Sequence, residues 1–317
     1  MLDKDASIYV AGHRGMVGGA VVRHLRSNGY QNLILKGREE LDLTNQGQVE
    51  AFFHSQKPEV VILAAAKVGG IHANNTYPAS FIYENLSIGL NVVHSAYLHG
   101  TKRLLNLGST CIYPREAPQP MPENCLLTGP LEKTNEAYAV AKIGILKLCE
   151  FYRRQHGALF HSAMPTNLYG PGDNYHPENS HVLPALIRRF HEAKLNGAGE
   201  IVVWGSGKPR REFLHVDDLV AAILHLIEIP NPPDLVNVGT GTDCSIREVA
   251  LMVADELGYS GEIVQDLSKP DGTLRKLTDT SLLRSTGWEA RISLREGIRL
   301  TVADYLEGLS AGTIRTS

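Results

Sequence analysis

The sequence predicts an α/β fold, in which a doubly wound parallel sheet is followed by a smaller C-terminal α/β domain. In the first half, short apolar runs rich in β-branched residues alternate with longer amphipathic segments. This alternation is typical of parallel strands joined by helical crossovers. A cluster of turn-forming residues at 169–173 indicates a boundary between two lobes. A chain of 317 residues is long enough to form both.

The expected elements of the larger domain alternate regularly. Strands are expected at 7–11, 32–35, 60–65, 103–108 and 159–164. Helices are expected between and after them at 16–27, 46–56, 78–98 and 136–155. Because the segment 60–65 is continuously apolar, we expect a buried strand there, with helices covering both faces of the sheet.

The second half of the chain divides between the two domains. Helices are expected at 182–194, 217–226 and 246–257, and strands at 200–204 and 235–238, the last returning to the first sheet. We therefore assign residues 1–170 and about 213–241 to the larger domain. Residues 171–212 and 242–317 are assigned to the smaller domain, which is expected to bind the substrate.

Composition excludes several classes of function. The net charge of −3 predicts no nucleic-acid partner, and no apolar run is long enough to span or anchor in a membrane. The four cysteines have no CxxC spacing, so neither a disulfide framework nor a metal site is expected. The N-terminus lacks a signal peptide, and free thiols suit a reducing compartment, which predicts a cytoplasmic protein.

A glycine-rich loop follows the first strand and opens the first helix. It consists of Gly12, His13, Arg14, Gly15, Met16, Val17 and Gly18. The first glycine permits a tight turn, the second lets the backbone approach a pyrophosphate, and the third lets helix and strand pack closely. The amides at the helix N-terminus then face the phosphates. In this context the loop predicts a Rossmann-type dinucleotide site, the alternative being a purely structural turn.

The end of the second strand favours NADP(H) over NAD(H). Arg38 stands where an arginine would bind the 2′-phosphate of NADP, and Lys36 is a weaker candidate. Glu39 complicates this interpretation, because a shift of one residue would place a carboxylate there, as in NAD sites. Asp42 and Leu43 are expected beside the adenine.

Tyr138 and Lys142 lie four residues apart on a predicted helix, so they share one face. A neighbouring ammonium favours the phenolate, and we expect it to lower the pKa of Tyr138 toward neutrality. Lys142 is also expected to bind the nicotinamide ribose. A YxxxK pattern alone is weak, but here it follows a dinucleotide loop and a strand that ends in a serine.

That serine is Ser109, at the end of the expected fourth strand, where ligands bind in doubly wound sheets. Its hydroxyl can stabilise the substrate oxygen during hydride transfer, and Thr110 is the alternative for this role. The segment from Leu107 and Gly108 to Thr110 is also expected along the cofactor.

Together, the glycine loop, Ser109, Tyr138 and Lys142 resemble the extended short-chain dehydrogenase/reductase family. Within it, further stretches are similar to enzymes that epimerise and reduce GDP-4-keto-6-deoxy-D-mannose. These stretches are 64–70 (AAAKVGG), 74–78 (NNTYP), 109–114 (STCIYP), 164–171 (MPTNLYGP), 179–182 (NSHV), 203–207 (VWGSG), 211–218 (REFLHVDD) and 269–272 (KPDG).

The resemblance implies further roles. Cys111 and His181 would exchange protons during 3,5-epimerisation, and their ordinary pKa values suit this chemistry. His181 would also contact the cofactor, as would Pro165, Thr166, Asn167 and Leu168. A GDP-sugar substrate would be held by Arg189, Trp204, Arg211 and Asp271. Helices 78–98 and 136–155 resemble those that form a homodimer interface in the family.

Other functions remain open at this level. A sugar-nucleotide 4-epimerase or 4,6-dehydratase would share the fold, although a dehydratase is expected to carry a carboxylate where this chain has Cys111. A dinucleotide-sensing protein without enzymatic activity would need neither Tyr138 nor Lys142 in register with Ser109.

Overall fold

The computed structural model describes residues 2–268 and 271–316. Its largest sheet has six strands in the order β10-β5-β4-β3-β1-β2, and every neighbouring pair is parallel. The strands are β1 (Ile8–Ala11), β2 (Leu33–Ile34), β3 (Val60–Leu63), β4 (Arg103–Leu107), β5 (Leu159–Pro165) and β10 (Leu235–Val238). The predicted doubly wound parallel sheet is confirmed, and β10 returns to it as expected.

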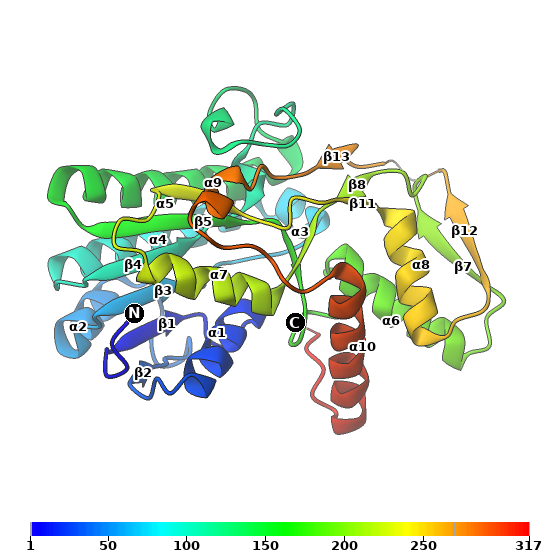
Figure 1. The fold of residues 1–317 in the computed structure, drawn as a ribbon, viewed down its shortest axis with the longest axis horizontal. Coiled ribbons are helices and arrows are strands. Elements are labelled where there is room, and N and C mark those ends of the chain that lie inside the picture. Colours follow the sequence, from blue (N-terminus) through cyan, green and yellow to red (C-terminus); the bar gives the residue numbers. More distant parts are fainter. Residues whose placement is uncertain (1, 269–270, 317) are drawn as a thin grey trace.

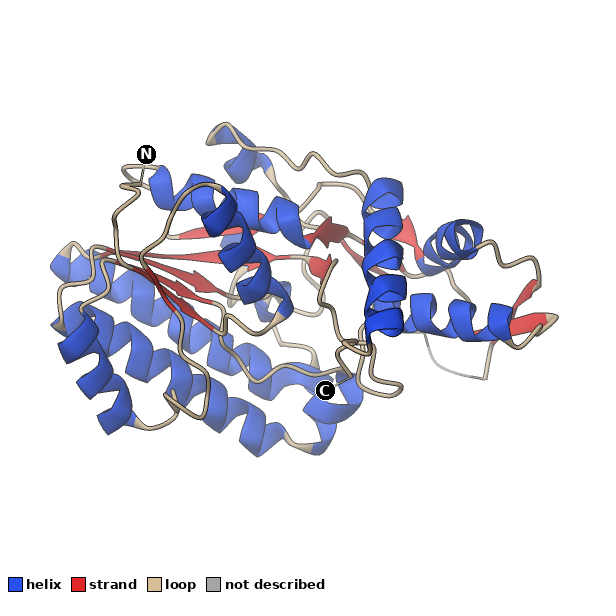
Figure 2. Ribbon diagram, turned by 90° about the horizontal axis from the view of Figure 1, so that it is seen from below, coloured by secondary structure: helices blue, strands red, loops and turns tan. Residues whose placement is uncertain are grey.

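Helices cover both faces of this sheet (Figures 1 and 2). One face carries α1 (Met16–Ser27) and α7 (Val216–Glu228), whose buried residues share a core with the strands. The other carries α2 (Gln46–Gln56), α4 (Pro78–Leu98) and α5 (Glu136–His156). Burial on both sides explains why β1 and β3 are apolar at every position.

The smaller lobe has its own core. Its helices are α6 (Val182–Leu195), α8 (Ile246–Leu257) and α10 (Leu294–Ala311), which contribute to one apolar cluster. Its strands are β7 (Glu200–Trp204), β8 (Arg210–Arg211), β11 (Cys244–Ser245), β12 (Glu262–Asp266) and β13 (Arg275–Lys276). They form the pair β12-β7 and the sheet β11-β8-β13.

The chain crosses between the lobes several times. A parallel pair links β6 (Asn167–Tyr169) to β9 (Phe213–His215). The remaining short helices are α3 (Ile71–Thr76), α9 (Ser281–Ser285) and three 3₁₀ turns at Thr110–Ile112, Glu123–Cys125 and Lys133–Asn135. Leu283 and Trp288 pack into the core of the larger domain, because α9 lies against β10. The segment 242–317 is therefore not wholly part of the smaller lobe, contrary to the expected division.

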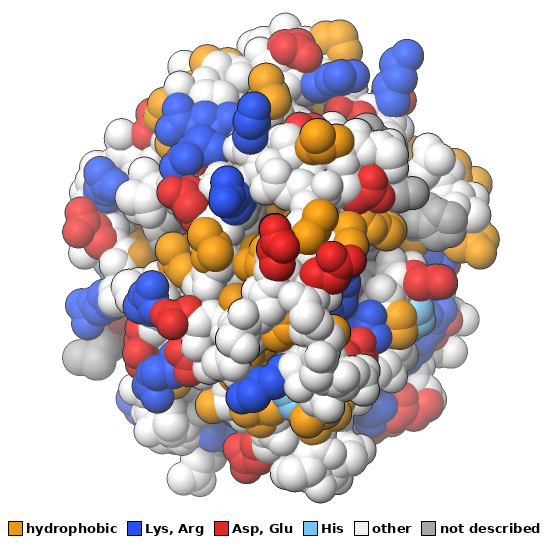
Figure 3. Space-filling model, turned by 90° about the vertical axis from the view of Figure 1, so that its right-hand side faces the viewer, with side chains coloured by type: hydrophobic (Ala, Val, Ile, Leu, Met, Phe, Trp, Pro, Cys, Tyr) orange, Lys and Arg blue, Asp and Glu red, His pale blue; other side chains and the backbone are white. Residues whose placement is uncertain are grey.

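On the end of the molecule seen in Figure 3, acidic and basic side chains are interspersed with apolar ones. Within residues 2–268 and 271–316, no helix combines the length and the apolar character required to cross a membrane.

Candidate active site

The glycine loop takes the conformation that its spacing predicts. Gly12 has a φ of +83°, and a Cβ there would lie 2.8 Å from the Ala65 backbone. A Cβ on Gly18 would lie 2.2 Å from the Gly12 carbonyl oxygen, so the first turn of α1 packs directly on the loop. Gly15 occupies the N-cap, and no side chain caps the helix. Its first amides are therefore available to an anion.

Three basic side chains near the end of β2 differ in their ion-pair partners. Arg14 of the loop pairs with Glu39 at 2.5 Å, and Lys36 pairs with Glu40 at 2.9 Å. Arg38, by contrast, is exposed and forms no ion pair with any residue that the structure describes. Since Glu39 is held by Arg14, Arg38 is the side chain free to bind an added anion.

Asp42 and Leu43 follow in the same loop. The Asp42 carboxylate accepts hydrogen bonds from the Thr44 amide at 3.0 Å and the Thr44 hydroxyl at 2.8 Å, which lower its pKa. The Leu43 carbonyl accepts a hydrogen bond from Asn91 of α4 at 2.9 Å. The loop is thus fixed from within and by a helix.

Ser109, Tyr138 and Lys142 meet beyond the end of β4. Ser109 caps the 3₁₀ turn that follows the strand, its Oγ accepting the Cys111 amide at 3.3 Å. A hydrogen bond also joins Ser109 to the Tyr138 side chain. The buried Lys142 ammonium donates to the Leu107 carbonyl at 2.8 Å and lies 5.7 Å from the centre of the Tyr138 ring.

Burial sets the pKa values of this pair. Desolvation raises the pKa of Tyr138, and the hydrogen bond with Ser109 only partly opposes it. Desolvation lowers the pKa of Lys142 to about 8. The direction for Tyr138 is opposite to the one expected from the sequence, because burial outweighs other effects and the ammonium is directed at the Leu107 carbonyl. Tyr138 is a protonated phenol at neutral pH, which suits a general acid.

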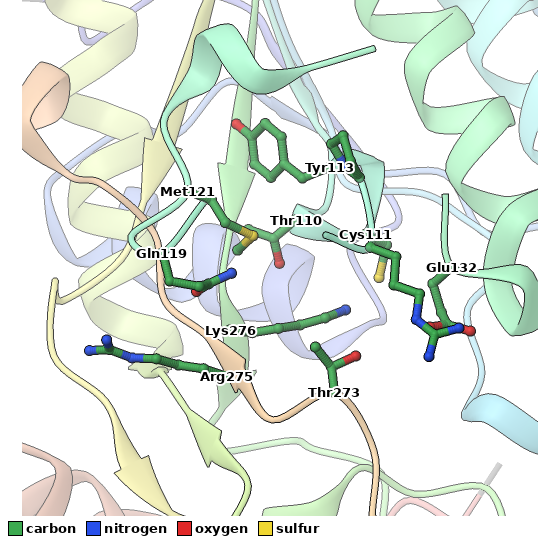
Figure 4. A pocket seen from close by; sticks show the side chains of 11 residues that line it. Thr110, Cys111, Tyr113, Gln119, Met121, Glu132, Thr273, Arg275 and Lys276 are labelled. Carbon is green, nitrogen blue, oxygen red and sulfur yellow. The ribbon is translucent and has the colours of Figure 1, made fainter. Parts of the chain in front are cut away.

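Cys111 lies on the same strand-end turn and faces a pocket (Figure 4). The pocket is lined by Thr110, Cys111, Tyr113, Pro114, Arg115, Gln119, Met121, Glu132, Thr273, Arg275 and Lys276. Three chain segments contribute to it: the end of β4, the connection that leads to α5, and the segment that contains β13. Cys111 is a free thiol, and its Coulombic interaction with Tyr138 contributes to the raised pKa of that phenol.

His181 comes from a different part of the chain, the start of α6 in the smaller lobe. It is the N-cap residue of α6, and desolvation lowers its pKa. Two residues earlier, the Asn179 carbonyl oxygen lies 3.9 Å from the Cβ position of Gly70, in the loop after β3. Within the described ranges, no hydrogen bond or ion pair connects His181 to Cys111.

The segment 165–168 crosses from the sheet to the smaller lobe. Pro165 ends β5, and Leu168 packs at the core of the larger domain. Thr166 donates its amide to Val238 of β10 at 3.1 Å, and the exposed Asn167 donates its side-chain amide to the Glu212 carbonyl at 2.7 Å. The segment therefore has a fixed position next to the strand ends.

The residues expected at the substrate lie around β7 and β8. Arg211 donates to the carbonyls of Thr273 at 2.6 Å and Arg210 at 2.8 Å. Arg189 of α6 donates to the Val202 carbonyl of β7. Trp204, at the end of β7, is 68% exposed. Asp271 accepts the amide and hydroxyl of Ser206, so its carboxylate holds the turn after β7.

Two buried polar residues that organise the site were missed in the sequence. The fully buried Glu212 accepts the Gly241 amide at 2.7 Å and the amide and hydroxyl of Thr278 at 2.9 and 2.7 Å. Asn237 in β10 accepts the Tyr113 hydroxyl at 2.6 Å and donates to the Met121 carbonyl. Asn237 could have been found in the sequence, because it is a polar residue inside an otherwise apolar strand. No sequence signal marks Glu212 itself, although it lies within the 211–218 stretch.

Comparison with known proteins agrees with this geometry. Residues 8–239 match the model of the NAD dependent epimerase/dehydratase family. The chain is 60% identical over 309 residues to the putative GDP-L-fucose synthase 2 of Arabidopsis thaliana, covering 98% of this chain and 94% of that protein. It is 54% identical to the GDP-L-fucose synthase of Escherichia coli, covering 95% of this chain and 96% of that one.

Solved structures show the same similarity. A GDP-L-fucose synthetase of Naegleria fowleri bound to NADP superposes with a TM-score of 0.90 at 30% identity, covering 100% of this chain and 98% of that one. A GDP-mannoheptose C4 reductase of Campylobacter jejuni with NADP bound has a TM-score of 0.90 at 39% identity, covering 96% and 100%. The chain therefore belongs to the NAD dependent epimerase/dehydratase family, in the group that includes the GDP-L-fucose synthases.

Proposed function

We propose that this protein is an NADP-dependent enzyme that converts GDP-4-keto-6-deoxy-D-mannose to GDP-L-fucose by 3,5-epimerisation and then 4-keto reduction. The observation that carries the proposal is that Ser109, Tyr138 and Lys142 converge at the edge where the free thiol of Cys111 enters the pocket. The relatives named GDP-L-fucose synthase, 54–60% identical over nearly the whole chain, support the same reaction.

The glycine loop and Arg38 fit NADP. A side chain at Gly12 would collide with the Ala65 backbone, and one at Gly18 with the Gly12 carbonyl, so both glycines keep the tight loop whose backbone can approach a diphosphate. Arg38 forms no hydrogen bond or ion pair with a described residue, its charge acting only at longer range on Asp42, and it can hold a 2′-phosphate by charge-assisted hydrogen bonds. Residues 42–43, 107–110 and 165–168, with Lys142 and His181, complete the proposed binding surface. Bound there, the reduced cofactor supplies the hydride for carbon 4.

In the reduction, the chain's own residues handle the substrate oxygen. Tyr138 donates its phenolic proton to the oxygen on carbon 4 as negative charge develops there. Ser109, hydrogen-bonded to Tyr138, stabilises the same oxygen. Lys142, fixed by the Leu107 carbonyl, keeps a positive charge behind the phenol and orients the nicotinamide ribose.

In the epimerisation, the keto group acidifies the protons on carbons 3 and 5. We assign their removal and return on the opposite face to Cys111 and His181. Desolvation lowers the pKa of His181, so its imidazole is neutral near pH 7 and able to accept a proton. Arg189, Trp204, Arg211 and Asp271 of the smaller lobe are proposed to hold the GDP moiety, through charge and a stacking face.

The direct test is NADPH consumption by the purified protein with GDP-4-keto-6-deoxymannose, followed by identification of the product by NMR. GDP-L-fucose is expected. Absence of NADPH consumption would refute the proposal, and a tightly retained NAD would instead indicate a 4-epimerase. The Cys111→Ser variant is expected to lose solvent-deuterium incorporation at carbons 3 and 5, and wild-type exchange in this variant would exclude Cys111 as the base.

We further propose that the protein acts as a cytoplasmic homodimer. Helices α4 and α5 pack against each other and expose apolar side chains: Tyr83, Leu90, Val140 and Phe151. An apolar face on two adjacent long helices suits pairing with a second copy.

A further inference from the structure

The small sheet β11-β8-β13 separates four basic side chains into two pairs. Strands β8 and β13 are parallel, with Arg275 opposite Arg210 and Lys276 opposite Arg211. On one face, Asp243 accepts Arg210 Nε at 2.7 Å and Arg275 Nε at 2.5 Å. Since successive side chains of a strand point to opposite faces, Arg211 and Lys276 lie together on the other face.

On that second face, no described carboxylate forms an ion pair with Arg211 or Lys276, and the one carboxylate that lines the pocket, Glu132, pairs with Arg115 at 3.6 Å. Arg211 binds the Thr273 and Arg210 carbonyls, and the Lys276 ammonium makes neither a hydrogen bond nor an ion pair with any described residue. Lys276 lines the pocket that contains Cys111. Figure 4 shows its side chain extending toward the Cys111 segment, whereas Arg275 extends away from it.

The backbone of Lys276 is anchored on both sides. Its carbonyl accepts the Glu212 amide at 3.3 Å. The Leu277 amide donates to the Gln119 side chain at 2.8 Å, and the Leu277 carbonyl accepts the Met121 amide at 2.8 Å. The ammonium therefore projects from a fixed point into the pocket, which is what a preorganised charge requires.

We infer that Lys276 is a further catalytic residue, whose ammonium stabilises the anion formed during epimerisation; this inference rests on the proposed function. When the base takes the proton from carbon 3 or 5, the C–H bond breaks and its electron pair moves onto the keto oxygen as an enolate. Reprotonation of the carbon on the opposite face returns those electrons to a new C–H bond. A cation beside this pocket lowers the energy of the enolate and of the transition state that leads to it.

A role at the diphosphate is the competing assignment for Lys276. Arg211 lies next to Lys276 on the same sheet face and is held beside Thr273. An arginine suits a diphosphate better than a lysine, because its fork of donors matches two oxygens at once. The extension of Lys276 toward Cys111 favours the reacting end of the sugar.

The test compares wild type, Lys276→Met and Lys276→Arg in D₂O, with deuterium incorporation at carbons 3 and 5 followed by NMR at saturating substrate. Lys276→Met is expected to slow exchange about 100-fold, the typical effect of removing one preorganised donor. The Kd for GDP, measured by calorimetry, is expected to change less than about threefold, since the charge acts mainly on the transition state. Lys276→Arg, which keeps the charge, is expected to recover part of the exchange.

Two controls make the outcome decisive. Lys102→Met removes one lysine at the opposite, N-terminal end of β4 and should exchange at the wild-type rate. A thermal melt of Lys276→Met should match wild type. Unchanged exchange in Lys276→Met, or a weaker GDP Kd with wild-type exchange at saturation, would overturn the inference. If wild type itself neither exchanges protons nor oxidises NADPH, the proposed function fails instead.

Discussion

At the scale of single residues, burial decides the protonation of the catalytic pair. Lys142 is 4% exposed, and its ammonium has one described hydrogen bond, to the Leu107 carbonyl. Its lowered pKa of about 8 follows from that desolvation. The pKa of Tyr138 is shifted upward instead, so its protonated form is favoured. Each group thus loses preference for its charged form, as expected for ionisable groups taken from water.

The first prediction concerns pH. Lys142 is charged below its pKa and neutral above it, so its contribution to the reduction should be lost as the pH rises through about 8. Tyr138, whose pKa is raised, remains protonated across this range. We expect kcat for reduction to fall above pH 8 in wild type. Arginine does not titrate in this range, so the residual activity of Lys142→Arg should lack this decline. If Lys142→Arg showed the same decline as wild type, the assignment to Lys142 would be wrong.

The second prediction concerns cofactor preference. Arg38→Ala should weaken NADPH binding about 10- to 100-fold, the range expected for the loss of 1.5–3 kcal/mol of hydrogen bonding to a charged group. NADH binding should change little, because NADH lacks the 2′-phosphate. Kd values for both cofactors, measured by fluorescence, check this. Lys36→Ala is the matched control, since Lys36 is already paired with Glu40, and an equal loss for both cofactors would refute the role of Arg38.

At the scale of elements, the glycine loop depends on one close approach. The first turn of α1 reaches the loop only because position 18 has no side chain, its Cβ position being 2.2 Å from the Gly12 carbonyl oxygen. The next residue, Gly19, has its nearest atoms at 3.5 and 3.6 Å, which is ordinary contact. Two adjacent glycines of the same helix therefore face different constraints.

The third prediction uses this difference. Gly18→Ala should destabilise the protein by about 2 kcal/mol or more, a fall in Tm of roughly 4 °C or more, and weaken cofactor binding. Gly19→Ala should keep or slightly raise Tm, because alanine is favoured over glycine within a helix by up to about 1 kcal/mol. Melting curves and NADPH titrations of both variants check this. Equal Tm values for the two variants would show that the close approach is not limiting.

At the scale of the whole molecule, the lobes are joined by a few buried polar groups. Glu212 connects the segments at Gly241 and Thr278 through its carboxylate, and its own carbonyl binds Asn167. These contacts fix the residue next to Arg211 relative to the ends of β5 and β10, and β5 is the sheet neighbour of β4, which leads to Ser109 and Cys111. The candidate site is therefore assembled from both lobes.

The fourth prediction tests the proposed dimer. Leu90 and Phe151 are 45% and 44% exposed on α4 and α5. The double variant Leu90→Glu, Phe151→Glu should disrupt the pairing of two apolar faces by introducing repelling charges. Light scattering should give about twice the 34.7 kDa chain mass for wild type and a single chain mass for the variant. A wild-type monomer would contradict the proposal, and Leu195→Glu, at an exposed leucine of α6, controls for the added charge.

Local sequence patterns were enough to predict the alternating elements of the larger domain and one helix of the smaller lobe. Helices 16–27, 46–56, 78–98 and 246–257 were predicted with the bounds that the structure has. Local signals suffice there: Ser245 and Glu248 form a capping box, and β-branched apolar runs mark buried strands. The glycine loop and the spacing of Tyr138 and Lys142 are equally local, because the loop spans seven consecutive residues and the Tyr–Lys pair spans five.

The way in which distant segments combine depends on contacts that no local pattern contains. The direction of the Tyr138 pKa shift depends on burial, which no spacing reveals. The return of 283–288 to the larger core, the partner of each basic residue near Arg38, and the arrival of Lys276 beside Cys111 all depend on contacts between segments far apart in the chain. Local patterns specify backbone conformation, whereas charge balance and desolvation are set by whatever the fold brings together.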